Sequence, residues 1–122
     1  MLRHARARPG QVFYDLGSGW GKVAAAAALM GLRATGVELS RRRWAKACAA
    51  AGALADGRGA ARRANGSLSF LRGSFLEVDL SDADIVFTNS LLWTDEVMRQ
   101  LGVATRRMRP GALVVSWQGV PG

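Results

Sequence analysis

A glycine-rich turn constrains this chain more than any other feature of its sequence. It lies in FYDLGSGWGKVAAAAALMG (residues 13–31), between a short apolar segment and an alanine-rich one. Gly17, Gly19 and Gly21 occupy alternate positions behind Asp15. Glycine adopts backbone conformations that other residues resist, and it lets the main chain lie close to a ligand. The pattern predicts a strand that passes through a ligand-binding turn into a helix.

Predicted strands and helices alternate along the whole chain. Short apolar segments bounded by turn residues indicate strands, and long segments rich in good helix formers indicate helices. Ser40 and Thr94 are the expected N-caps of the second and third helices. The alternation favours an α/β fold with a doubly wound, mainly parallel sheet, and a ligand at the carboxyl edge of its strands. The strands are expected at 11–16, 32–39, 68–75, 83–89 and 112–117, and the helices at 20–30, 41–55 and 94–108, with a loop at 56–67.

The length of 122 residues predicts a single domain, 1–122, of ordinary globular composition. Residues 1–10 are basic and are expected to form a disordered tail, with the start of a transit peptide as the alternative. No apolar run approaches the roughly 20 residues that a membrane-spanning helix needs, so no membrane contact is predicted. Cys48 is the single cysteine, which excludes an internal disulfide, and it is expected to be buried. No metal site is predicted.

Two familiar nucleotide-binding motifs fit the glycine turn poorly. A P-loop would need glycine where Leu16 stands and serine or threonine where Val23 stands, so the sequence excludes it twice. The dinucleotide fingerprint G-x-G-x-x-G would need its third glycine where Lys22 stands. A dinucleotide therefore remains an alternative that only the first two glycines support.

The pattern that does fit is Asp15-x-Gly17-x-Gly19-x-Gly21, followed by Glu38 at the end of the second predicted strand. A carboxylate at that strand end can accept two hydrogen bonds from a ribose diol. Asp15 can receive a ligand's ammonium group. The alternative is structural: a tight turn between strand and helix in which both acids only cap backbone groups.

Four segments together resemble one enzyme family. They are FYDLGSGWGKV, TGVELS, RGSFLEVDLSDADIVFTNSLLW and MRPGALVVSW. D-x-G-x-G-x-G with a downstream acid is the pattern of the class I S-adenosylmethionine-dependent methyltransferases. Its combination with GSFL and VFTNS is similar to the non-SET histone H3 lysine methyltransferases of the disruptor-of-telomeric-silencing type. The resemblance covers roughly residues 11–117.

The resemblance implies S-adenosyl-L-methionine as the cofactor of a Rossmann-like methyltransferase core. Asp15, Gly17 and Gly19 would hold the methionine part. Glu38 would bind the ribose, and Phe75 would line the adenine. The predicted cofactor-binding residues are Asp15, Gly17, Ser18, Gly19, Gly21, Glu38, Ser74, Phe75 and Asn89.

The resemblance also implies where a target lysine would enter. Asn89 would lie at the mouth where cofactor and lysine meet, and Trp93 could line the lysine channel; both are predicted as catalytic residues. A place for Trp93 in the core is the alternative. Ser74 replaces the family's aspartate that accepts the adenine amino group, so adenine recognition should be weaker. Ser90 replaces a second asparagine, and Leu91 stands where aromatic residues usually line the channel.

The ends of the chain also depart from the family's pattern. The family has a helical segment and a cofactor-closing loop before the first strand, and class I methyltransferases add an antiparallel pair after strand five. We expect strand order 3-2-1-4-5, apparently truncated at both ends, with strand five as an exposed edge. A gene fragment, a partner-dependent subunit and a degraded relative are the alternatives.

Charge is distributed unevenly along the chain. The net charge is +8, and residues 74–97 hold six acids and no base. A basic face can attract nucleic acid or a protein bound to it, whereas a merely solvated basic helix face is the alternative. The resemblance implies a histone or nucleosome partner and hence the nucleus, with the cytoplasm as alternative. DNA phosphate contacts are predicted for Arg41, Arg42, Arg43, Arg62 and Arg63.

These observations lead to three hypotheses. The first is an S-adenosylmethionine-dependent protein lysine N-methyltransferase, directed at histone H3, that transfers methyl to a lysine amine by in-line displacement. The second is a class I methyltransferase for a non-histone protein or a small molecule. The third is a non-catalytic remnant that keeps the cofactor fold.

Overall fold

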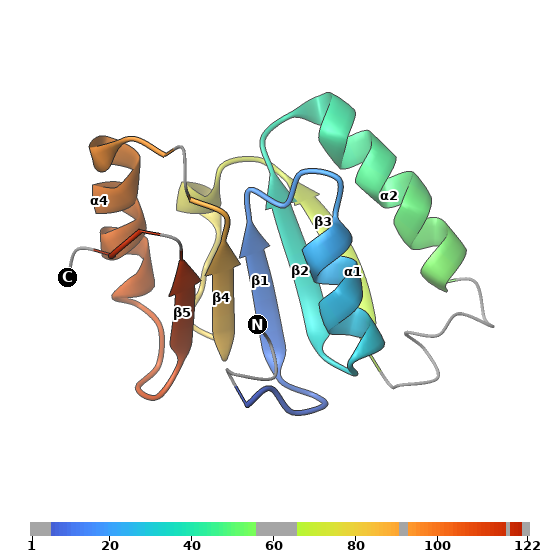
Figure 1. The fold of residues 1–122 in the computed structure, drawn as a ribbon, viewed down its shortest axis with the longest axis horizontal. Helices are drawn as coiled ribbons and strands as arrows, with labels where there is room; N and C mark the ends of the chain where they lie inside the picture. The colour runs from blue at the N-terminus through green and yellow to red at the C-terminus, as the bar shows by residue number, and fades with distance from the viewer. Residues whose placement is uncertain (1–5, 56–65, 91–92, 117, 121–122) are drawn as a thin grey trace.

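The protein forms a five-stranded sheet in which every neighbouring pair of strands is parallel (Figure 1). The structure, a computed structural model, describes residues 6–55, 66–90, 93–116 and 118–120. The strand order is β3-β2-β1-β4-β5, as predicted. The strands are β1 (Val12–Leu16), β2 (Arg33–Glu38), β3 (Ser67–Arg72), β4 (Ile85–Thr88) and β5 (Leu113–Ser116). The helices are α1 (Lys22–Leu29), α2 (Arg41–Ala55), the short 3₁₀ helix η1 (Phe75–Glu77) and α4 (Asp95–Thr105).

The sheet carries a separate hydrophobic core on each face. Successive strand residues point to opposite faces, so Ile85 and Val86 of β4 belong to different cores. The first core packs α1 against Phe13, Ala34 and Ile85, and the alanines of α1 let that helix lie close to the strands. The second packs Met98 and Leu101 of α4 against Leu16, Val37 and Val86. The fold is therefore doubly wound, with helices on both faces.

Helix α2 lies on the same face as α1. The indole Nε1 of Trp44 donates a hydrogen bond to the backbone oxygen of Phe70 in β3, at 3.1 Å. The methyl group of Ala47 lies 3.3 Å from where a Cβ on Gly21 would stand. The chain thus covers one face with the helices after β1 and β2, and the other with the segments after β3 and β4. The crossing point between β1 and β4 is where such sheets open a crevice for ligands.

The structure corrects the predicted start of the first helix and the end of the third strand. Helix α1 begins at Lys22 rather than residue 20, because Gly21 has a left-handed backbone (φ 87°) that no helix residue adopts. Strand β3 ends at Arg72 rather than residue 75, because Gly73 has φ 152° and turns the chain away from the ladder. The hydroxyl of Ser74 then accepts a hydrogen bond from the Leu76 N–H at 3.2 Å and begins η1.

Other boundaries differ by a few residues or are confirmed. The fourth and fifth strands are shorter than predicted, and α4 ends at Thr105 rather than residue 108. Helix α2 has the predicted bounds, with Ser40 accepting from the Arg43 N–H, and Thr94 caps α4 by accepting from the Val97 N–H. Cys48 is half-buried rather than buried.

Among the described helices, none combines the length and the apolar character that crossing a bilayer requires. Residues 1–5 of the predicted tail and 56–65 of the predicted loop lie outside the described residues. Residues 6–10 are ordered rather than disordered, since the Gly10 N–H donates to the backbone oxygen of Gly31 at 2.9 Å.

Candidate functional site

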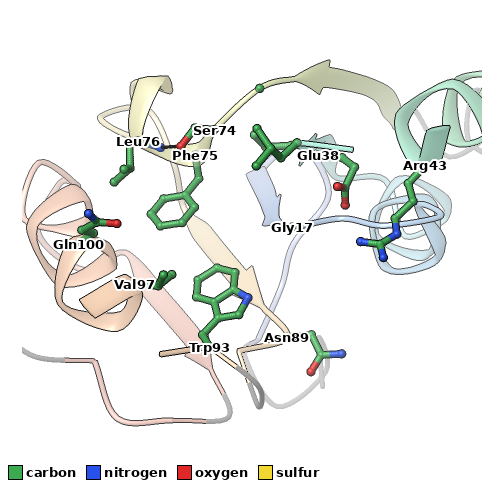
Figure 2. Close-up of a pocket in the computed structure, with 13 residues that line it drawn as sticks. Gly17, Glu38, Arg43, Ser74, Phe75, Leu76, Asn89, Trp93, Val97 and Gln100 are labelled. Atoms are coloured by element: carbon green, nitrogen blue, oxygen red, sulfur yellow. Dashed lines mark hydrogen bonds between the residues drawn. The ribbon is translucent and has the colours of Figure 1, made fainter. Parts of the chain in front are cut away.

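A pocket of about 620 Å³ opens at the carboxyl edge of the sheet, next to the crossing point between β1 and β4. That size is within the range of roughly 300–1,000 Å³ typical of small-molecule sites. Its walls come from the glycine turn, the ends of β2 and β4, η1 and α4 (Figure 2). The lining residues are Gly17, Val37, Glu38, Leu39, Arg43, Gly73, Ser74, Phe75, Leu76, Asn89, Trp93, Val97 and Gln100.

Gly17 is the glycine of the turn that faces the pocket. Its backbone is left-handed (φ 76°), and a Cβ there would stand 3.3 Å from Cζ2 of Trp93. The N–H groups of Gly17 and Ser18 both donate to the backbone oxygen of Val37, at 2.8 and 3.0 Å. The end of β2 therefore holds the turn in place, and the absence of a side chain leaves room for the indole and for a ligand.

The other two glycines of the turn serve different purposes. The N–H of Gly19 donates to Oε1 of Glu38 at 2.7 Å. A Cβ on Gly21 would stand 2.5 Å from Cζ of Phe70, so this glycine is required by packing between α1 and β3. Ser18 is buried, and its hydroxyl lies 2.7 Å from where a Cβ on Gly36 would stand. Ser18 and Gly21 therefore shape the turn from outside the pocket.

Glu38 is held rigidly at the end of β2 and lines the pocket. Its side chain is only 5% exposed, and its two oxygens accept from the N–H groups of Gly19 and Ser40, each at 2.7 Å. A carboxylate oxygen has about two lone-pair sites, so each oxygen can accept one more hydrogen bond. Two adjacent acceptors held in one plane are suited to a pair of neighbouring hydroxyl groups.

Asp15, predicted as a cofactor-binding residue, lies near the end of β1, is 3% exposed and does not itself line the pocket. Burial, together with the negative charge of Glu38, raises the pKa of Asp15 to about 7. Neither carboxylate forms an ion pair with any described cation. Two like charges in a poorly solvated place are unfavourable, so this end of the pocket favours a ligand that carries positive charge.

The raised pKa of Asp15 makes stability depend on pH in a specific direction. The folded protein holds the proton up to about pH 7, whereas the unfolded chain releases it near 3.8, so stability falls as pH rises between these values. We expect Asp15→Asn to stabilise the ligand-free protein, and its gain in melting temperature over wild type to grow from about pH 5 to about pH 8. Thermal melts of both proteins across that range would measure it. A gain that stays constant would contradict the assignment.

An aromatic pair forms the opposite wall of the pocket. The rings of Phe75 and Trp93 stack with centroids 5.3 Å apart and planes within 5° (Figure 2). Both side chains are half-buried, and Asn89 is exposed at the end of β4. Arg43, from the first turn of α2, reaches the rim beside Glu38. The pocket therefore has a carboxylate side and an aromatic side, suited to a ligand with a hydroxylated part and a flat part.

Most predicted site residues come together at this pocket. Gly17, Glu38, Ser74, Phe75, Asn89 and Trp93 line it, Gly19 and Asp15 support it, and Ser18 and Gly21 lie behind the turn. The contribution of α4 was not predicted. Its Val97 and Gln100 line the pocket and are three residues apart, which places them on one face of the helix. That spacing was a usable signal. Arg62, Arg63 and Leu91 lie outside the described residues, as does His4, and no three His, Cys, Asp or Glu side chains of the described parts gather as metal ligands.

The sheet order and this site define the class I S-adenosylmethionine-dependent methyltransferase core. An RNA methyltransferase from Salinibacter ruber, solved with S-adenosyl-L-homocysteine, matches with a TM-score of 0.72 and 28% identity, over 94% of this chain and 69% of that one. A model of the ANTKMT methyltransferase domain matches residues 15–118, and the chain belongs to that family. None of the curated proteins matches the chain in sequence.

More distant structures share the fold. A SAM-dependent methyltransferase from Methanosarcina mazei has a TM-score of 0.75 at 20% identity, over 93% of this chain and 55% of its own. One from Geobacter sulfurreducens, bound to S-adenosyl-L-homocysteine, has a TM-score of 0.67 at 23% identity, over 98% and 47%. The chain thus spans about two thirds of the first relative and about half of these two. S-adenosyl-L-methionine is the cofactor that this fold and family use.

The pocket's own chemistry fits that cofactor. The sulfonium and ammonium groups of S-adenosylmethionine carry positive charge, for which Asp15 and Glu38 have no ion-pair partner among the described side chains. The ribose of the cofactor has the diol that suits Glu38. The aromatic wall of Phe75 and Trp93 suits a flat base. The observation that decides the fit is that Asp15 and Glu38, both buried, form no ion pair with a cation in the described parts of the chain.

Proposed function

We propose that this protein is an S-adenosylmethionine-dependent protein lysine N-methyltransferase, with histone H3 in the nucleosome as its substrate and the nucleus as its location. Family membership and fold support methyl transfer. The lysine substrate rests on the resemblance of GSFL and VFTNS to the histone methyltransferases. The observation that carries the proposal is the juxtaposition of Glu38, Asn89 and Trp93 around one pocket.

We assign a part in cofactor binding to five residues of the site. Glu38 would accept from the ribose hydroxyls, and Asp15 would receive the ammonium group. Gly17 leaves space for the methionine part, because any side chain there would meet Trp93. Phe75 and Ser74 border the adenine. When bound, S-adenosyl-L-methionine supplies an electrophilic methyl group, so the protein has to align an amine with it and exclude water.

The target amine enters beside Asn89 and Trp93. A lysine amine attacks only as its neutral form, and an apolar surrounding lowers the pKa of an ammonium group. Trp93 and Val97 give the pocket such a wall, whereas Asn89 offers an amide for orienting the amine. Arg41, Arg42 and Arg43 are exposed at the start of α2, and Arg43 lines the pocket. These arginines would bind phosphate or an acidic protein surface near the target.

Ser74 provides a prediction on cofactor affinity. Its hydroxyl caps η1, and aspartate caps helices equally well, so Ser74→Asp should keep the local structure. The added carboxylate can accept a hydrogen bond from the adenine amino group, worth about 1.5 kcal/mol, and should tighten binding of S-adenosylmethionine about tenfold. Calorimetric titration would measure this. The same substitution at Ser81, whose backbone N–H is already capped by Asp79, is the control and should leave affinity unchanged.

A methyl-transfer assay tests the function itself. The purified protein and methyl-labelled S-adenosylmethionine are incubated in separate reactions with one substrate each: nucleosomes, free histone H3, a histone-free protein extract, total RNA or a small-molecule extract. We expect label on a lysine of nucleosomal H3, and none with the Glu38→Ala variant. Label in another fraction alone would overturn the histone assignment. No label in any fraction from a protein that binds the cofactor would identify a non-catalytic remnant.

A further inference from the structure

A polar cluster of Ser90, Ser116 and Gln118 ties the end of β4 to the end of β5. Ser90 is fully buried, and its hydroxyl lies 2.7 Å from that of Ser116. The Ser116 hydroxyl donates to the backbone oxygen of Gln118 at 2.7 Å, so Ser90 must donate in the bond between the two serines. The backbone N–H of Gln118 points to both hydroxyls, at 3.4 and 3.2 Å.

The side chain of Gln118 reaches further, to the loop that leads into α4. Its Nε2 donates to the backbone oxygen of Ser90 and, at 3.1 Å, to the backbone oxygen of Trp93. A primary amide has two N–H donors, and both partners here are carbonyl oxygens, which can only accept. One side chain therefore fixes both ends of the segment 90–93, between the pocket residues Asn89 and Trp93.

Trp93 has little freedom once its backbone is fixed. Its ring stacks on Phe75 on one side, and its Cζ2 lies 3.3 Å from the Cβ position of Gly17 on the other. A shift of the Trp93 backbone by about 1 Å would break the stack or press the ring against the glycine turn, because dispersion contacts fall off within that distance. The two carbonyl contacts of Gln118 therefore act on the placement of the aromatic wall, together with the hydrogen bond that the Trp93 N–H donates to the Ser90 oxygen at 3.0 Å.

We propose that Gln118 is a positioning residue for the cofactor pocket: through the carbonyls of Ser90 and Trp93 it holds the Trp93 indole between Phe75 and Gly17. The inference rests on the proposed role of this pocket in binding S-adenosylmethionine. Gln118 itself need not touch the cofactor, and it does not line the pocket. Its effect is on the shape of the aromatic wall.

Fluorine NMR tests the positioning without any ligand. The protein has four tryptophans, so labelling with 5-fluorotryptophan gives four signals, and Trp93→Phe identifies that of Trp93. In Gln118→Ala, and in Gln118→Glu, which keeps the volume but loses both donors, we expect the Trp93 signal to shift or broaden while those of Trp20 and Trp44 stay. The signal of Trp117, the neighbour of the substituted residue, is not used. Gln11→Ala is the matched control, since Gln11 accepts from the Arg8 N–H at the opposite end of β1 and should change no signal.

Calorimetric titration with S-adenosylmethionine then measures the consequence. We expect affinity about tenfold weaker in both Gln118 variants, with the same weakening of S-adenosylhomocysteine. An unchanged Trp93 signal in variants that fold would overturn the positioning, whatever the binding result. A changed signal with affinity within about twofold of wild type would overturn its role in the pocket. If wild type binds neither ligand, the proposed function fails, whereas the NMR result still decides whether Gln118 places Trp93.

Discussion

Replacing Glu38 with alanine is expected to lower the affinity for S-adenosylmethionine about 100-fold. Each ribose hydroxyl that donates to a carboxylate contributes about 1.5 kcal/mol, and two such bonds together correspond to about two powers of ten. The variant also removes the acceptor for the N–H groups of Gly19 and Ser40, so the glycine turn loses its link to the end of β2. Calorimetric titration of wild type and variant with S-adenosylmethionine and S-adenosylhomocysteine would measure the loss.

Glu77→Ala is the matched control for this experiment. Glu77 is exposed on η1, directly after the pocket residue Leu76, and does not line the pocket itself. The same change of residue next to the pocket, but outside its lining, should leave affinity within about twofold. Thermal melts establish that both variants are folded. A Glu38→Ala protein that is folded and binds as wild type does would place the ribose elsewhere and refute the site.

A large loss of stability is expected when Gly21 is substituted. An alanine there would have to adopt a left-handed backbone, which costs roughly 1–2 kcal/mol. Its methyl group would also press on the ring of Phe70, and this overpacking of the core costs about 1–2 kcal/mol more. We expect Gly21→Ala to lower the free energy of unfolding by about 3 kcal/mol and the melting temperature by roughly 12 °C. Chemical denaturation and calorimetry would measure both.

Two further variants separate the backbone cost from the clash. Gly111 has the same φ of 87° as Gly21, but a Cβ there would have nothing within 4 Å. Gly111→Ala should therefore cost only about 1 kcal/mol. Phe70→Leu, which shortens the clashing ring, should recover about 1–2 kcal/mol in the double variant with Gly21→Ala. Equal losses at Gly21 and Gly111, or no coupling to Phe70, would contradict the packing role.

The fold was predictable because its elements alternate without ambiguity. Each strand is a short apolar run bounded by turn residues, and parallel strands joined by helices leave few possible topologies. Two of the boundary errors arose at Gly21 and Gly73, where a positive φ changes the path of the chain. A glycine in a sequence shows that such a conformation is permitted and does not show that it occurs, so these boundaries could not be fixed beforehand.

The site was predictable where a motif encodes it and not where side chains meet through the fold. Glu38 was found because its position at a strand end has a fixed relation to the glycine turn. The stack of Phe75 on Trp93 joins two segments 18 residues apart, and Gln118 reaches a loop 25 residues before it. Nothing in the local pattern of either segment specifies such contacts. The purpose of Gly21 was also misjudged, since its neighbour is Phe70 rather than the pocket.

The order of the strands also determines when during synthesis the pocket can exist. The carboxylate side of the pocket can form once residues 15–40 have left the ribosome, whereas the aromatic side needs residues 75–93. The hydrogen bond to the backbone oxygen of Trp93 also requires Gln118, near the end of the sequence. Every strand pair in this sheet is parallel and forms only after a crossover, so folding is slow compared with that of local structure. A nascent chain therefore exposes Asp15 and Glu38 to water before their burial in the completed sheet makes a cationic ligand favourable. Cofactor binding therefore stabilises only those chains in which both halves of the sheet have already joined.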